Sequence, residues 1–239
     1  MKSERINVNK LKLTTAIVSL MTITAASAWS QAITVSSFTN NTPTIVPDGN
    51  PVGVTKQFAV SGLSGSISDV QVQLDITGGF NGDLYAYLVS PTGQLSVLLN
   101  RVGLSAGNPV GYSDAGFNIT LDGQAANNIH YYQAGSYTVQ NGQLTGTWAA
   151  DGRNIDPQSS GSVFDGTNPT LGLDIYDGVD GAGVNGTWTL FVADLAAGGG
   201  TAVIDPTALT IDTVPEPASL ALAAAGAAGL VLFRRKTRA

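Results

Sequence analysis

The sequence predicts an all-β fold, a β-sandwich or jelly roll, and three observations lead to that prediction. Apolar and polar residues alternate with a period of two over 70–76 and 117–122, as in strands with one buried face. Clusters of Gly, Pro, Ser and Thr separate the alternating segments, for example at 77–79 and 90–93. Between residues 33 and 213, no stretch shows helical periodicity over a useful length.

The predicted strands follow one another along the chain. In a late strand, Trp188, Leu190 and Val192 share one face, as alternation requires. A lead rich in Ser, Thr, Asn and Pro at 34–51 predicts a loosely held first strand, and 141–185 predicts long loops. Strands are expected at 57–61, 70–76, 83–89, 95–99, 117–122, 136–140, 188–193 and 207–212.

The composition limits the chemistry available to the chain. It has 239 residues, of which 43% are hydrophobic and 12% charged, and it has no cysteine. A disulfide framework, a cysteine nucleophile and a thiolate metal site are therefore excluded, so folding must rest on core burial and on any ions that bind. With its two ends set aside, the chain has the size of one all-β domain.

The predicted domain, residues 33–213, is strongly acidic. It has fifteen acidic residues, all of them aspartate, and three basic ones, Lys56, Arg101 and Arg153, which gives a net charge of −12. Such a balance repels nucleic acid and anionic lipid, so we expect no binding to a phosphate backbone. It suits divalent cations or cationic partners.

The N-terminus has the parts of a secretory signal peptide over residues 1–32. An apolar stretch at 16–25 is too short to span a bilayer, and small residues after it offer cleavage after Ala28 or after Ala32. A basic start precedes the apolar stretch, with Lys2, Arg5, Lys10 and Lys12. We therefore predict a signal helix that signal peptidase removes during export. The alternative is an ordinary N-terminal helix.

The C-terminus has three parts in order. The motif Val214-Pro215-Glu216-Pro217 leads into an uncharged apolar run at 218–233. A transmembrane helix over that run is roughly 24 Å long, slightly short of the hydrocarbon core, and cations beyond it can reach the interface to make up the difference. These cations are Arg234, Arg235, Lys236 and Arg238. Their position predicts a cytoplasmic C-terminus and a domain outside.

This tail, residues 214–239, resembles a PEP-CTERM sorting signal, which has the same order of Pro-Glu-Pro, apolar helix and arginine-rich end. The resemblance implies that an exosortase, a membrane cysteine transpeptidase, cuts the chain near the motif. It also implies a Gram-negative-type bacterium, in which the protein is first anchored in the inner membrane and then reaches the envelope surface or the extracellular matrix. The alternative is a plain tail anchor with a chance Pro-Glu-Pro.

Two stretches of the domain resemble the P domain (P/Homo B domain) of subtilisin-like proprotein convertases. One starts at Phe80 and contains Gly-Asp-Leu and Ser-Pro-Thr-Gly before Arg101, and the other, at 185–194, reads Asn-Gly-Thr-Trp-Thr-Leu-Phe-Val-Ala-Asp. The resemblance implies a jelly-roll β-sandwich related to galactose-binding-like domains, which supports a neighbouring protease and performs no chemistry itself. The middle, 111–183, is longer than the family's usual connection, so no residue role is carried over there.

The sequence does not supply a serine-protease triad, although the resemblance could suggest one. A triad needs a base between its nucleophile and a carboxylate, and the chain's one histidine is His130, beside Tyr131 and Tyr132 in a polar segment. One Gly-x-Ser-x-Gly pattern occurs, Gly103-Leu104-Ser105-Ala106-Gly107, but no helical pattern follows it, as a nucleophile elbow requires. We therefore predict that the chain is not an enzyme and that His130 is a hydrogen-bonded surface residue.

Aspartate-rich loops are the candidate metal site, with calcium as the candidate ion. Asp174, Asp177 and Asp180 follow at three-residue spacing, and Asp83 and Asp194 lie in the two stretches that resemble the P domain. Calcium takes several hard oxygen ligands from flexible loops, and extracellular sites can be weak. The spacing does not fit an EF-hand loop. The alternative is that these aspartates cap turns and solvate loops.

Tyr131, Tyr132 and Trp148 are the candidate ligand patch. They lie in less regular sequence, whereas Trp188 belongs to an alternating strand and is expected in the core. Sugar-binding jelly rolls use exposed aromatic faces together with Asp or Asn. The alternative is that the three residues pack in the core or anchor loops.

Three functions remain open from the sequence. The first is a non-catalytic surface or matrix protein, processed by exosortase, whose sandwich mediates adhesion or binds extracellular polysaccharide or protein. The second is a calcium-stiffened structural component of the envelope or of a biofilm. The third is an accessory domain acting with a separate subtilisin-like serine protease.

Overall fold

The computed structural model of the chain describes residues 33–215 and Gly226. The predicted signal peptide, Glu216, Pro217, the remainder of the predicted helix at 218–233 and the basic cluster after it lie outside the described residues. Within the part that is described, no helix is both long enough and apolar enough to cross a membrane.

Strands dominate the described residues, which form twelve strands and five short helical segments. The strands are β1 (Thr34–Asn40), β2 (Thr44–Val46), β3 (Asn50–Val60), β4 (Ser66–Thr77), β5 (Leu84–Val89), β6 (Leu95–Asn100), β7 (Phe117–Asp122), β8 (Thr138–Gln140), β9 (Gln143–Trp148), β10 (Gly186–Asp194), β11 (Ala202–Ile204) and β12 (Thr207–Val214). The helical segments are η2 (Asn81–Asp83), η3 (Ile129–Ala134), α2 (Gly161–Asp165), η4 (Leu173–Tyr176) and η5 (Gly181–Val184). The predicted all-β class is confirmed.

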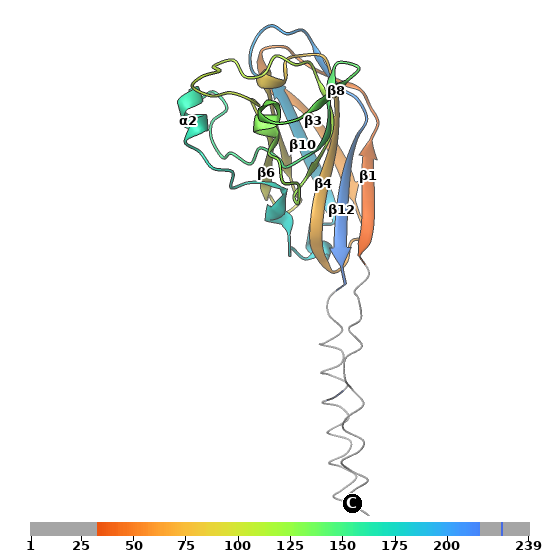
Figure 1. Ribbon diagram of the computed structural model, residues 1–239. Coiled ribbons are helices and arrows are strands. Elements are labelled where there is room, and N and C mark those ends of the chain that lie inside the picture. The colour runs from red at the N-terminus through yellow and green to blue at the C-terminus, as the bar shows by residue number, and fades with distance from the viewer. Residues whose placement is uncertain (1–32, 216–225, 227–239) are drawn as a thin grey trace, which may run out of the picture. The chain divides into compact units, whose positions relative to one another are not determined.

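The strands are arranged in two sheets (Figure 1). The larger has the order β1-β12-β4-β7-β9-β8, with β11 pairing with both β2 and β4, and the smaller has the order β3-β10-β5-β6. Strand pairs are antiparallel except for β7 and β9, which are parallel. The chain passes through η3 and β8 between these two strands, because parallel neighbours need a crossover rather than a tight turn.

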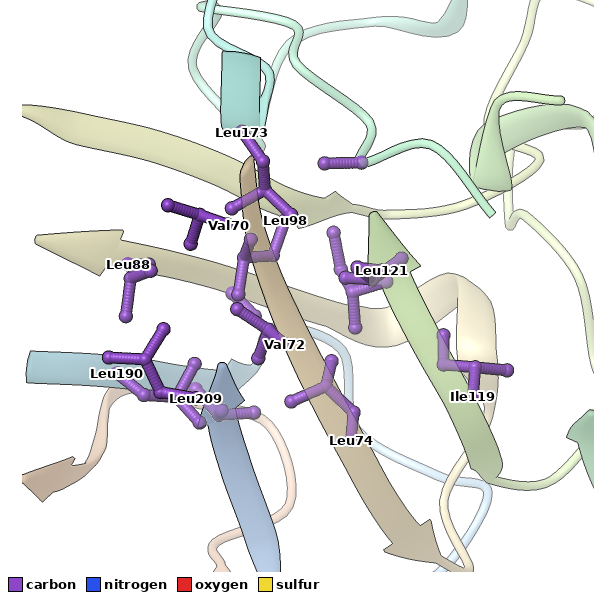
Figure 2. Close-up of a cluster of buried hydrophobic side chains, with 14 of the residues drawn as sticks. Val70, Val72, Leu74, Leu88, Leu98, Ile119, Leu121, Leu173, Leu190 and Leu209 are labelled. Atoms are coloured by element: carbon purple, nitrogen blue, oxygen red, sulfur yellow. The ribbon is translucent and has the colours of Figure 1, made fainter. Parts of the chain in front are cut away.

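The two sheets bury alternate side chains against each other, which makes the fold a β-sandwich. Val70, Val72 and Leu74 of β4 are fully buried and face Leu88 of β5 and Leu190 of β10 across the core (Figure 2). The polar residues between them on β4 point to the other face of the sheet. Burial of apolar area is the main stabilising contribution for a chain that has no disulfide.

Two segments are more ordered than the sequence predicts. The lead at 34–51 contains β1, and all seven residues of β1 pair with β12. The segment 141–185 contains β9, which buries Leu144 and Trp148. β9 could not be recognised from the sequence. Gly146 lies between Leu144 and Trp148, on the face of the strand that buries these two residues, where alternation would place an apolar residue.

The two ends of the described domain lie side by side at one edge of the larger sheet (Figure 1). Because β1 and β12 are antiparallel neighbours, Thr34 lies opposite Thr213. β12 continues to Val214, the first residue of the predicted sorting motif, which pairs with Ser66 of β4. The sheet therefore runs directly into the motif.

Replacement of Leu190 tests the contribution of the contact between the sheets. Leu190→Ala removes fully buried atoms and leaves a cavity, so the free energy of unfolding should fall by about 2–5 kcal/mol. Val52→Ala, at a side chain that is 79% exposed, should change it by less than about 0.5 kcal/mol. Chemical denaturation measures both, and equal effects would contradict the placement of Leu190 in the core.

Candidate functional site

An open pocket of about 300 Å³ lies beside η3 and the end of β9. The three residues of the predicted ligand patch, Tyr131, Tyr132 and Trp148, all line it. Tyr131 is 43% exposed, whereas Tyr132 and Trp148 are buried. The fold thus gathers around one cavity the aromatic side chains that the sequence singles out.

Asn128 fixes the segment before η3 against the residues that follow β9. Its Oδ1 accepts a hydrogen bond from the backbone N–H of His130 at 3.0 Å. Its Nδ2 donates to the backbone carbonyls of Ala150 and Asp151, at 2.7 and 3.1 Å. Because both amide donors are used inside the protein, Asn128 shapes the pocket and is not free to bind a ligand.

Tyr132 joins the pocket to the interior. Its hydroxyl donates to Oδ2 of Asp114 at 2.8 Å and accepts from Nδ2 of Asn81 at 3.3 Å. Its ring packs edge-to-face against Tyr112 and Trp148, with centroids 4.7 and 6.2 Å away. Burial raises the pKa of Tyr132, so the phenol stays protonated and keeps its bond to Asp114.

Behind the pocket, His130 belongs to a buried row of polar side chains that continues through Asp151 to Arg153. Its Nδ1 lies 2.7 Å from Oδ2 of Asp151, and its Nε2 lies 3.0 Å from the carbonyl oxygen of Leu104. Asp151 also accepts from Nη1 of Arg153 at 3.0 Å, and the Arg153 guanidinium lies 4.8 Å from the centroid of the Tyr131 ring. The row therefore supports Tyr131, the exposed aromatic residue of the pocket.

The prediction that His130 lies on the surface is wrong, because its partners come from distant parts of the chain. Asp151 and Leu104 are 21 and 26 residues away, and Phe164 of α2 stacks on the imidazole ring at 5.6 Å. Both ring nitrogens lie within hydrogen-bond distance of oxygens inside the protein, at Asp151 and Leu104. The fully buried histidine–aspartate pair joins η3 to the segment that follows β9.

The residues that line the pocket are neutral. Besides the three aromatic residues they include the exposed Asn127 and Ser136, whose side chains can donate and accept hydrogen bonds. Aromatic faces beside amide and hydroxyl groups suit a ligand with an apolar face and a polar rim. Asn127 and Ser136 could not be identified as lining residues from the sequence, because single polar residues in loops form no distinctive pattern.

Two of the five predicted metal ligands, Asp83 and Asp194, lie close together at one end of the smaller sheet. Asp194 is opposite Leu84, the neighbour of Asp83, and the two aspartates are 0% and 5% exposed, respectively. Burial, followed by the charge of Asp194, raises the pKa of Asp83 to about 6. Arg101, whose Nη2 lies 3.8 Å from Oδ1 of Asp83, opposes the rise.

Asp194 has a buried oxygen that lacks a partner. Its Oδ1 accepts from the backbone N–H of Ala196 at 3.3 Å, but its Oδ2 has no hydrogen-bond partner among the described residues. Asp48 adds its charge to this neighbourhood, and no local signal could have identified it because it lies far earlier in the sequence. Within residues 33–215, no group of three or more Asp, Glu or His side chains is arranged to hold a metal ion.

The remaining predicted ligands lie elsewhere. Asp180 accepts from the backbone N–H of Ala182 at 3.0 Å and caps η5, as the turn-capping alternative predicts. Asp174 lies in the first turn of η4 and Asp177 directly after it, and both are exposed. The structure therefore does not bring the five aspartates into one site.

Comparisons with known proteins match two parts of the chain. Residues 67–163 match the proprotein convertase P-domain, and residues 213–236 match the PEP-CTERM protein-sorting motif, so both predicted resemblances are confirmed. The second stretch that resembles the P domain, 185–194, lies outside the matched residues. In the structure it contains the whole of β10, which pairs with β5 of the first stretch.

Two solved structures are similar to this chain. A chain from the crystal structure of the Aeromonas sobria serine protease with its chaperone is 14% identical over 77% of this chain, with a TM-score of 0.42. The structure of the Aeromonas sobria serine protease is 13% identical over 76% of this chain, also with a TM-score of 0.42. This chain spans 27% of the length of either one. No curated protein matches the chain.

The buried carboxyl groups predict a fold that is more stable at mildly acidic pH than at neutral pH. The pKa of Asp83 is about 6 in the folded protein against an ordinary 3.8, so the folded state holds an extra proton between these values. Stability should therefore fall as the pH rises through this window, and the raised pKa values of Asp69 and Asp194 act in the same direction.

Thermal denaturation in buffers that contain a chelator measures this effect. We expect a higher Tm near pH 5 than near pH 7, and a smaller difference in Asp83→Asn, which cannot titrate. A pH dependence that is unchanged in Asp83→Asn would show that this carboxyl is not its source.

Proposed function

We propose that this chain is an exported, non-catalytic surface or matrix protein that binds extracellular polysaccharide in the aromatic pocket. The observation that carries the proposal is the gathering of Tyr131, Tyr132 and Trp148 around a cavity of about 300 Å³. Apolar faces of sugar rings can pack on aromatic rings while sugar hydroxyls bond to neighbouring amide and hydroxyl groups. The volume is at the small end for ligand pockets and suits about one or two sugar units.

The sorting motif supports the extracellular setting of this proposal. A PEP-CTERM motif indicates exosortase-dependent export and membrane-anchored sorting in Gram-negative bacteria. We infer that signal peptidase cuts after Ala28 or after Ala32 and that the helix at 218–233 anchors the protein in the inner membrane. Exosortase then cuts near the motif at 214–217, and the domain reaches the cell surface or the matrix, where polysaccharide is present.

The P-domain match supports a role without catalysis. The P-domain is a non-catalytic accessory domain, and the histidine of this one is occupied on both ring nitrogens. A jelly-roll topology related to galactose-binding-like domains belongs to the same proposal, on the analogy of fold alone. An accessory role beside a separate serine protease is the alternative, and recovery of such a protease with the tagged protein from its own cells would favour it.

A glycan array tests the proposed function. The full-length protein, solubilised in a detergent without sugar headgroups, should bind a subset of the glycans. Tyr131→Ala should weaken that binding by about tenfold or more, because it removes the exposed ring of the pocket.

Tyr87→Ala is the matched control for this experiment. Tyr87 is a partly buried tyrosine of β5 that stacks on Phe191, with ring centroids 4.7 Å apart, and does not line the pocket. It should leave glycan binding unchanged. Equal loss in both variants, or no binding by the unaltered protein, would argue against the pocket as a sugar site.

We also propose that calcium stiffens the domain at Asp83 and Asp194. The buried and unpartnered Oδ2 of Asp194 favours this second role. The three negative charges of Asp48, Asp83 and Asp194 and the positive charge of Arg101 add up to −2, which one divalent cation would balance. Since the carboxylates alone do not form a metal site, backbone carbonyls and water would have to complete the shell.

Thermal denaturation with and without calcium tests this role. Millimolar calcium should raise the Tm near pH 7, and the increase should be smaller near pH 5, where protons compete for Asp83. Asp194→Asn should abolish the increase, whereas Asp180→Asn, which alters an exposed cap, should preserve it. The same Tm in chelator and in saturating calcium would exclude a structural calcium ion.

A further inference from the structure

We propose that the aromatic pocket selects neutral sugars and rejects uronic acids and other anionic sugars, an inference that rests on the carbohydrate-binding function proposed above. The residues that line the pocket carry no charge, as described. A ligand carboxylate placed there would lose part of its hydration without gaining a cationic partner.

The cations of the domain cannot supply that partner, because all three are engaged in the interior. Lys56 is 3% exposed and donates to the backbone carbonyls of Asn40 and Asp205, at 3.4 and 3.1 Å. The side chain of Arg101 is 16% exposed and lies beside Asp83. The surface of residues 33–213 therefore presents almost no positive charge to an anionic glycan.

Arg153 is the cation nearest to the pocket, and its position shows why it cannot reach a ligand. It is 2% exposed, and its Nη1 bonds to Oδ1 of Asp151 at 3.0 Å. Its guanidinium covers one face of the Tyr131 ring. A sugar would therefore meet Tyr131 on the opposite face, with the ring between its own atoms and the guanidinium.

Negative charge, in contrast, lies close to the pocket. Oδ2 of Asp114 accepts from the hydroxyl of Tyr132 and from Nε2 of Gln133, at 2.8 and 2.7 Å. The domain around it has a net charge of −12. Repulsion by a carboxylate at short range and by the whole domain at long range should reduce the affinity for an anionic sugar by roughly tenfold or more at low salt.

Pairs of oligosaccharides that differ only in oxidation at C6 test the proposal. The full-length protein, in a detergent without sugar headgroups, is titrated with glucose, galactose and mannose oligomers and with the corresponding uronic acid oligomers. In every pair that binds, the neutral member should bind about tenfold tighter at low salt, and added salt should leave its affinity unchanged.

The outcomes separate this proposal from the function on which it rests. Equal or tighter binding of the acidic members would overturn the selectivity and leave the sugar site standing. If no member of any pair binds and the glycan array shows no binding, both the selectivity and the proposed sugar-binding function would be overturned.

A positive charge introduced at the pocket gives a gain-of-function test. Ser136→Lys places an ammonium group among the lining residues and should strengthen binding of the acidic members by about tenfold. Val52→Lys makes the same change of net charge at an exposed side chain of β3, which is not part of the pocket lining, and should have little effect. Equal gains in both variants would show that overall charge, and not the pocket, sets the preference, and would overturn the proposal.

Discussion

Alternate side chains of β4 bury the larger sheet against β5 and β10 of the smaller one, and no covalent cross-link assists them. β4 lies between β12 and β7, so its inward face fixes the strands on either side. Both candidate sites are built at the ends of strands that this core positions. Trp148 ends β9 and Asp194 ends β10, so the packing that folds the domain also orients the pocket and the acidic cluster.

The basic residues of the domain lie in its interior, whereas most of its aspartates lie at its surface. Lys56 links β3 of the smaller sheet to the ends of β1 and β11 in the larger one through two backbone carbonyls. Arg153 braces Asp151 behind the pocket, and Arg101 partly offsets the carboxylate of Asp83. Because the three cations of residues 33–213 hold loops and sheets together in the interior, the charge on the exterior of this domain comes almost entirely from aspartate.

Local features of this protein could be predicted from its sequence, and features that depend on distant contacts could not. Period-two alternation identified the core residues of β4 and β7, because the buried face of a strand appears in its own sequence as apolar residues at every second position. β9 was hidden by Gly146 and by a parallel pairing that no local pattern specifies. Tyr131 and its aromatic neighbours could be named as candidates, but the cavity between them depends on Asn128 reaching across to the end of β9. The burial of His130 similarly required a carboxylate far along the chain.

The pairing of β1 with β12, which places Thr34 opposite Thr213, also determines how the domain responds to a pulling force. A protein held by its C-terminal end while its ligand resists movement is pulled along β12. This strand has β1 on one side and β4 on the other, and its interstrand hydrogen bonds lie perpendicular to its axis. Tension along β12 therefore shears both ladders at once and does not open them one bond at a time, so the strand that leads into the sorting motif is held against extraction on both sides.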